Sequence, residues 1–212
     1  QPEYPKGAFV SEDSPYHNFF HFFDDRPEAW PYNPNYDSWW GNDTLPKLSY
    51  EDSPELEQYI MDIGKKWVSP PYNVDGWRLD VAADLGCSNE YNHMFWKRFR
   101  KEVKSANPNA LILAEHYGDP AEWLQGDEWD SVMNYDAFME PLTWFLTGME
   151  KHSDERRTDL WGNVDNFVGA MRHFMASMLT PSLQVAMNEL SNHDHSRFLT
   201  RTNHIVGRAE HV

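Results

Sequence analysis

Apolar residues recur with a helical period in three stretches of the chain after residue 50. Ser53 is suited to cap a helix and Pro54 to its first position, so the first stretch predicts a helix that ends before Pro70 and Pro71. Its apolar face consists of Leu56, Tyr59, Ile60, Ile63 and Trp67. A second helix is expected from about Glu90 to Ser105, and a third covers roughly Val164–Leu179.

Four short segments between or after these helices predict β-strands. They lie near Val74–Val81, Leu111–Ala114, Val132–Tyr135 and Val185–Leu190. The run Leu111–Ala114 contains no polar residue, as expected of a strand that is buried on both faces. Strands that alternate with helices indicate an α/β fold built from parallel βα units.

Residues 1 to about 50 show neither a strand period nor a helix period. They are rich in Pro, Asn, Asp and aromatic residues, so we expect a long ordered loop region with a short helix near His17–Phe23. The sequence therefore predicts two parts, a loop-rich segment 1–50 and an α/β part 51–212.

Composition narrows the class of partner. The net charge of -16 disfavours a nucleic-acid partner, and no apolar run is long enough to span a membrane. The 10 Trp, 10 Tyr and 12 Phe either pack in core and loops or offer flat faces on which sugar rings stack. The single cysteine, Cys87, excludes an internal disulfide and slightly favours a cytoplasmic location. A chain that begins with Gln is expected to lack its natural N-terminus, which leaves secretion open.

Charged side chains follow the predicted strands at their carboxyl ends. Arg78 and Asp80 are two residues apart and so face the same side of an extended chain. A neighbouring guanidinium favours the ionised carboxylate, which suits a nucleophile, although such a pair also occurs as a structural ion pair. Glu115 ends the second run and Asp194 follows the last. Because active sites in βα folds collect at these strand ends, the carboxylates together with Arg78 and His193 predict one active site.

Several segments resemble a known family. Gly76-Trp77-Arg78-Leu79-Asp80, Glu115 and Asn192-His193-Asp194 resemble three successive conserved regions of the α-amylase superfamily, glycoside hydrolase family 13. Leu45–Ser49 and Val81–Asp84 resemble the MPKLN and VANE segments of its neopullulanase, cyclomaltodextrinase and maltogenic amylase group. Two places depart from the family pattern. A Tyr stands at position 117, where a Trp is usual, and the second departure is His195-Ser196.

The resemblance implies a role for each site residue. Asp80 would be the nucleophile, Glu115 the general acid and base, and Asp194 the carboxylate that stabilises the transition state. Arg78, His193, Tyr117 and Asn192 would contact the substrate. Such a retaining mechanism places the two reacting carboxyl groups about 5–5.5 Å apart.

The resemblance also implies a fold and a substrate. It predicts a partial (β/α)8 TIM barrel, about strands 4 to 7, preceded by the end of a domain inserted after strand 3. Because the family's first conserved region and last strand are absent, the chain is expected to be a fragment that is inactive and aggregation-prone in isolation. The whole enzyme would cleave α-1,4 or α-1,6 bonds of maltodextrins, cyclodextrins or pullulan. A transglycosylase with the same residues and a non-catalytic amylase-like module are the alternatives.

No cofactor and no catalytic metal are expected. A structural calcium near Asp84 is compatible with the family, but no spacing in the sequence specifies it. The substrate is the one partner predicted, and an oligomer is compatible with the full-length protein.

Overall fold

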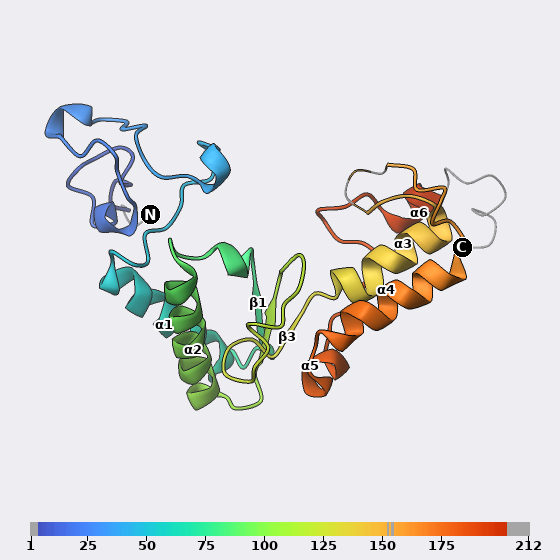
Figure 1. Ribbon diagram of the computed structural model, residues 1–212. Coiled ribbons are helices and arrows are strands. Elements are labelled where there is room, and N and C mark those ends of the chain that lie inside the picture. Colours follow the sequence, from blue (N-terminus) through green and yellow to red (C-terminus); the bar gives the residue numbers. More distant parts are fainter. Residues whose placement is uncertain (1–3, 152, 154, 203–212) are drawn as a thin grey trace. The chain divides into compact units, whose positions relative to one another are not determined.

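The computed structural model of the protein describes residues 4–151, 153 and 155–202 (Figure 1). The chain forms two compact units, each built from two segments. The first consists of Gln1–Val74 and Asp84–Pro108, and the second of Asp75–Ala83 and Asn109–Val212. The predicted boundary at residue 50 stays a prediction.

The first unit begins with the loop-rich segment that the sequence predicts. Its regular structure consists of three short 3₁₀ helices, η1 (His17–Phe19), η2 (Pro27–Ala29) and η3 (Trp39–Gly41). Isolated antiparallel bridges join Phe20 to Leu48, Phe22 to Tyr36 and Ser38 to Pro46. The expected short helix near His17 is thus confirmed.

Two paired helices complete the first unit. In α1 (Pro54–Val68), the Ser53 hydroxyl accepts the Leu56 N–H at 3.3 Å, and in α2 (Asn89–Ala106) the Ser88 hydroxyl caps the first turn in the same way. The helices pack closely at Gly64, because a Cβ there would lie 2.8 Å from the Phe99 ring. Both predicted helices are confirmed.

The second unit contains a parallel sheet of three strands, β1 (Gly76–Leu79), β2 (Leu111–Ala114) and β3 (Ser131–Val132), in that order. Leu79 pairs with Ala114, so the carboxyl ends of β1 and β2 lie level. The core beside the sheet consists of Leu113, Met133, Tyr135 and Met139. The predicted parallel α/β arrangement is confirmed.

The strand predicted at Val185–Leu190 is wrong. Only Met187 pairs with the sheet, through a parallel bridge to Met133 in which the Met187 N–H donates to the Val132 carbonyl at 3.1 Å. Val185 and Leu190 are exposed, and one bridge does not hold their backbone extended. The third strand is also shorter than predicted, because Tyr135 begins a π-helix, η5 (Tyr135–Met139).

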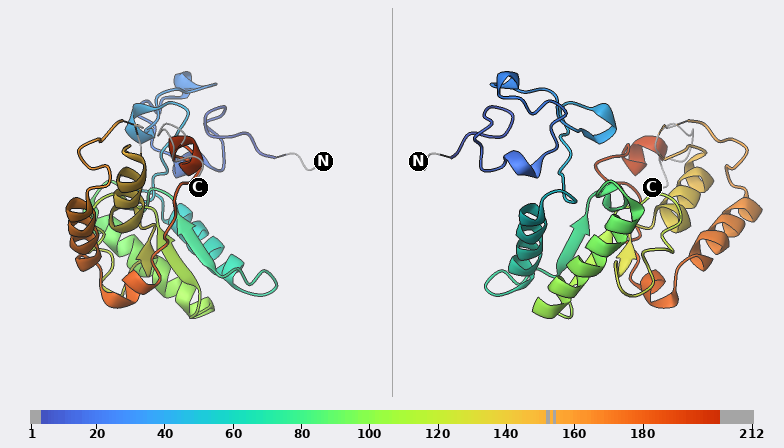
Figure 2. Two further views of the ribbon diagram at one scale, coloured as in Figure 1. Left: turned by 90° about the vertical axis from the view of Figure 1, so that its right-hand side faces the viewer. Right: turned by 60° about the vertical axis from the view of Figure 1, so that its left-hand side comes forward.

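Helices follow the sheet along the rest of the described chain. These are α3 (Glu140–Thr147), α4 (Val164–Ala176), α5 (Thr180–Gln184) and α6 (Phe198–Thr202), and a 3₁₀ turn, η4 (Ala82–Asp84), follows β1. Figures 1 and 2 show α3 and α4 side by side. Helix α4 ends three residues before the predicted Leu179, and no residue of α4 is fully buried. Helix α3 escaped prediction, although Pro141 in its first turn and left-handed Gly148 after its last residue mark its ends.

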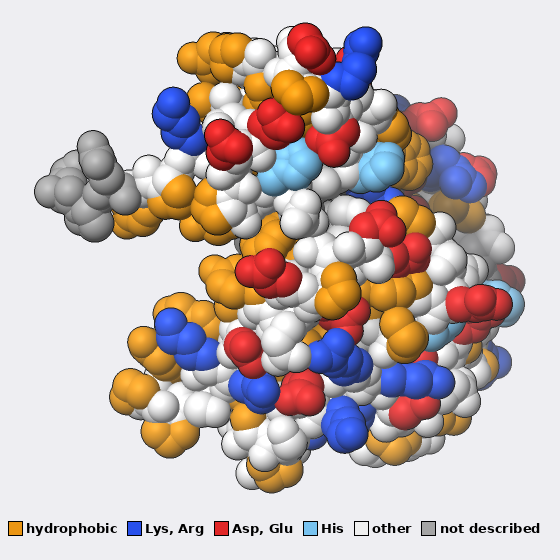
Figure 3. Space-filling model, turned by 90° about the vertical axis from the view of Figure 1, so that its left-hand side faces the viewer, with side chains coloured by type: hydrophobic (Ala, Val, Ile, Leu, Met, Phe, Trp, Pro, Cys, Tyr) orange, Lys and Arg blue, Asp and Glu red, His pale blue; other side chains and the backbone are white. Residues whose placement is uncertain are grey.

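The surface carries charges of both signs. Figure 3 shows acidic and basic side chains interspersed with apolar ones on one face. Among the described residues, no helix is long and apolar enough to cross a membrane.

Replacement of Gly76 by Ala tests the backbone contact that pairs β1 with β2. A Cβ at position 76 would lie 2.1 Å from the Leu111 carbonyl oxygen, so the strands must separate. We expect Gly76→Ala to lower the free energy of unfolding by about 2 kcal/mol or more, measured by urea denaturation. The matched control is Gly169→Ala in α4, where an added Cβ would meet no atom within 4 Å. Ala there favours the helix over Gly by up to about 1 kcal/mol. Equal stabilities of the two variants would contradict the prediction.

Candidate active site

One arginine joins the carboxylates that follow β1 and β2. The Nη1 atom of Arg78 donates to Oδ1 of Asp80, and its Nη2 lies 3.2 Å from Oε1 of Glu115. The Asp80 side chain is 76% exposed, whereas that of Glu115 is 7% exposed. The guanidinium therefore connects one carboxylate open to solvent with one that is buried.

The surroundings of Arg78 keep it charged. Burial opposes its charge, but Asp80 and Glu115 outweigh burial and hold the pKa of the guanidinium above its ordinary value. Its Nε also contacts the Met133 sulfur at 3.4 Å. A fixed positive charge thus lies against both carboxylates.

The backbone after Asp80 is strained. Val81 adopts a φ of 43°, which is rare for a β-branched residue. In this conformation the Val81 N–H donates to Oε2 of Glu115 at 3.0 Å. A strained residue of this kind persists only where its surroundings hold it, and such residues cluster at functional sites.

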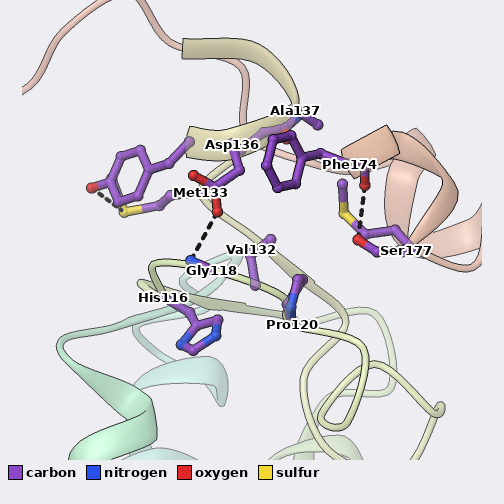
Figure 4. Close-up of a pocket in the computed structure, with 12 residues that line it drawn as sticks. His116, Gly118, Pro120, Val132, Met133, Asp136, Ala137, Phe174 and Ser177 are labelled. Atoms are coloured by element: carbon purple, nitrogen blue, oxygen red, sulfur yellow. Dashed lines mark hydrogen bonds between the residues drawn. The ribbon is translucent and has the colours of Figure 1, made fainter. Parts of the chain in front are cut away.

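The segment after Glu115 is anchored at several points. The His116 ring packs against Trp123 and Trp129, with ring centroids 4.9 and 6.0 Å apart. The Gly118 N–H donates to Oδ2 of Asp136 at 2.8 Å, across a small pocket that Figure 4 shows. These contacts fix the loop that carries Glu115.

Tyr117 lies next to Glu115. Its hydroxyl is 3.5 Å from Oε1 of Glu115, and its ring stacks on Tyr135 with centroids 4.6 Å apart. Burial raises the pKa of Tyr117, so its hydroxyl remains protonated at neutral pH. The residue is 43% exposed, which leaves part of it available to a ligand.

Asn192 uses the full hydrogen-bonding capacity of its amide within the protein. Its Nδ2 donates to the Tyr135 hydroxyl at 2.9 Å and to Oε1 of Glu189 at 3.0 Å. Its Oδ1 accepts from the Asp194 N–H at 2.9 Å and lies 2.6 Å from Nδ1 of His195. The amide therefore organises the loop that contains His193 and Asp194.

His193 and Asp194 project from this loop. Their side chains are 75% and 44% exposed, with Nε2 of His193 3.5 Å from Oδ2 of Asp194. The structure thus brings Arg78, Asp80, Glu115 and Tyr117 into direct contact, and it joins the Asn192–Asp194 loop to them through Tyr135. It does not bring the Asp194 carboxylate into an ion pair with Arg78, which contacts the other two carboxylates.

Three neighbours of the site escaped prediction from the sequence, namely Met133, Tyr135 and Glu189. Tyr135 is the last residue of the third predicted strand, so its position at a strand end was a usable signal. In the described part of the chain, no three His, Cys, Asp or Glu side chains converge as a metal site.

The site thus lies at the carboxyl ends of a parallel sheet, where one arginine contacts two carboxylates. The chain belongs to the α-amylase family, since the alpha amylase catalytic domain matches residues 2–211.

Similar proteins come from the group that the sequence motifs resemble. The chain is 33% identical over 201 residues to a maltogenic alpha-amylase of Bacillus acidopullulyticus, which covers 95% of this chain and 31% of that protein. It is 38% identical over 192 residues to neopullulanase 2 of Thermoactinomyces vulgaris, covering 89% of this chain and 29% of that protein.

Solved structures agree with this family. Ttha1563 of Thermus thermophilus has a TM-score of 0.75 at 30% identity, covering 94% of this chain and 41% of that one. The cyclic alpha-maltosyl-(1→6)-maltose hydrolase of Arthrobacter globiformis, in its ligand-free form, has a TM-score of 0.70 at 29% identity, covering 95% and 41%. The chain thus spans about a third of the length of its curated relatives.

Replacement of Glu189 by Gln tests the cost of a partly buried charge beside Asn192. Burial raises the pKa of Glu189, so the folded protein binds its proton more tightly than the unfolded chain does. The stability contributed by this proton is present below the unfolded pKa and is lost as the pH rises through the folded pKa. Because Gln carries no charge and still accepts a hydrogen bond, we expect Glu189→Gln to be more stable than wild type at pH 7. The difference should vanish near pH 4.

Thermal unfolding between pH 4 and pH 8 measures this difference. The control is Glu12→Gln in the loop-rich segment, where the glutamate is exposed. A gain that is the same at every pH would contradict the electrostatic explanation.

Proposed function

We propose that the protein containing this chain is a retaining glycoside hydrolase that cleaves α-glucosidic bonds through a covalent glycosyl-enzyme. The observation that carries the proposal is the contact of one guanidinium, Arg78, with Asp80 and Glu115. Glycosidases assign two roles to two carboxyl groups by giving them different surroundings, and these two differ in burial.

Asp80 is the proposed nucleophile. Its carboxylate attacks the anomeric carbon and forms an ester bond to it, while protonated Glu115 gives its proton to the glycosidic oxygen that leaves. In the second half of the reaction Glu115 takes a proton from water, the water oxygen bonds to the anomeric carbon, and the ester bond to Asp80 breaks. The exposure of Asp80 supports its role, since the sugar must reach it from solvent.

The remaining residues are proposed to bind and orient the sugar. Asp194 accepts hydrogen bonds from ring hydroxyls, His193 donates one, and Tyr117 offers its exposed ring for stacking. The Asn192 amide has no hydrogen-bonding capacity left for a ligand, so we propose that it acts on the substrate through the loop it holds.

The proposed substrates are maltodextrins, cyclodextrins and pullulan. The names of the relatives, maltogenic alpha-amylase, neopullulanase and cyclomaltodextrinase, support this choice. Cleavage of α-1,4 bonds is the primary proposal, with α-1,6 bonds as a second class. The presence of all three carboxylates weighs against a non-catalytic module.

The test uses the protein expressed from its whole reading frame, with Asp80→Asn and Glu115→Gln as variants. We expect wild type to release sugars from cyclodextrin, pullulan or starch with retained anomeric configuration, followed by NMR. Each variant should lose at least about a thousandfold in kcat, because the covalent step or the proton transfer fails. Asp13→Asn, in an exposed loop, is the matched control and should keep full activity.

Two outcomes decide against the proposal. Products of inverted configuration would refute the covalent intermediate, and full activity of Asp80→Asn would refute the nucleophile. The same assay with an added acceptor sugar separates hydrolysis from transglycosylation, since water and a sugar hydroxyl compete for one glycosyl-enzyme.

A further inference from the structure

We propose that Tyr135 is a positioning residue that couples the loop carrying Glu115 to the loop carrying His193 and Asp194. The inference rests on the proposed function, because it concerns the geometry of the same site. It assigns a role to a residue that contacts both loops through its side chain.

Tyr135 is held firmly in the second unit. It is 1% exposed and belongs to the apolar core beside β2 and β3. It is also the first residue of the π-helix η5, and π-turns occur frequently at functional sites. Its hydroxyl lies 3.5 Å from the sulfur of Met133, which in turn contacts Arg78. Tyr135 is thus a fixed point from which more exposed groups can be oriented.

On one side, the π-helix holds the loop of Glu115 at two places. The Tyr135 ring stacks on Tyr117 with an interplanar angle of 16°, and the Tyr117 hydroxyl faces Glu115. The next residue, Asp136, accepts the Gly118 N–H at 2.8 Å (Figure 4). Both contacts act within three residues of Glu115.

On the other side, Tyr135 orients the amide of Asn192. The Asp194 N–H can only donate, so the Asn192 atom that it contacts must be the oxygen. The amide nitrogen therefore donates to the Tyr135 hydroxyl at 2.9 Å. The same assignment makes Nδ1 of His195 a donor, and the His195 ring packs edge-on against Tyr135 with centroids 5.7 Å apart.

These contacts make the two loops depend on one another. If the Asn192 loop moves away from Tyr135, the Asn192 amide loses an acceptor for its N–H, and the orientation in which its oxygen holds the Asp194 N–H is less constrained. Because Tyr135 is buried and does not face the open side of the site, it acts through Tyr117 and Asn192 rather than on the substrate.

The test compares two Tyr→Phe variants of the protein expressed from its whole reading frame. Tyr135→Phe keeps the ring stack and removes the hydroxyl that Asn192 contacts. Tyr91→Phe is the matched control, since its hydroxyl donates to Oε2 of Glu57 at 2.7 Å in the first unit. Tyr135→Phe loses the contacts of its hydroxyl with Asn192 and Met133, and Tyr91→Phe loses the one with Glu57. A purely structural role predicts a loss of thermal stability in both variants and no specific kinetic change.

We expect Tyr135→Phe to lower kcat about three- to tenfold while KM changes less than about twofold, assayed well below both unfolding temperatures. The pH profile of kcat/KM should shift for Tyr135→Phe and not for Tyr91→Phe, because the surroundings of Glu115 change. Asn192→Ala removes the same contact from the other side. The double variant should therefore be no slower than the slower single variant.

The outcomes separate this inference from the proposed function. Equal kinetics of Tyr135→Phe and Tyr91→Phe, or fully additive effects with Asn192→Ala, would overturn the inference alone. An inactive wild type would overturn the proposed function and with it this inference. If Tyr135→Phe does not fold, a normal kcat for a folded Asn192→Ala overturns the inference, and a loss of kcat with unchanged KM supports it.

Discussion

The contact of Arg78 with two carboxylates depends on the register between β1 and β2. Leu79 pairs with Ala114, so Asp80 and Glu115, each one residue further on, leave the sheet at the same level. A shift of β1 by one residue would turn Arg78 to the opposite face of the sheet and separate the charges. Gly76 stabilises this register, because it has no Cβ and the backbone of β1 can therefore approach Leu111 closely. The site therefore rests on a backbone contact at the far end of the strand.

Local signals account for the part of the fold that the sequence predicts. Ser53 with Pro54 and Ser88 mark the starts of α1 and α2, and the apolar run Leu111–Ala114 is the buried strand β2. The failures occur where tertiary contacts decide. A short segment such as Val132–Tyr135 suits a strand or a helix equally, and the chain changes from one to the other within it. Met187 pairs only because Met133 lies opposite, which no local pattern reveals.

The candidate site divides in the same way. Arg78, Asp80 and Glu115 could be predicted because one rule, that parallel strand ends meet at one edge, brings them together. The link from Tyr135 to Asn192 spans 57 residues, and no local pattern in the sequence indicates that these two side chains meet. The backbone of Val81 could not be predicted from its residue type, because β-branched residues rarely adopt a positive φ and Val81 has a φ of 43°. Its N–H contact with Glu115 gives the reason, and such conflicts are expected at functional sites.

The shared arginine also explains how the proposed chemistry proceeds without moving charged side chains. In the proposed mechanism Asp80 enters the first step as a carboxylate and Glu115 enters it as a carboxylic acid. After that step Asp80 would be a neutral ester and Glu115 a carboxylate. Arg78 contacts both groups and stays cationic, because its pKa is held above the ordinary value. In this mechanism Arg78 therefore faces one negative charge both before and after the step. The charge lies on Asp80 before the step and on Glu115 after it. A guanidinium suits this exchange because its two Nη atoms can contact two carboxylates at once, whereas the single ammonium of a lysine would have to move between them.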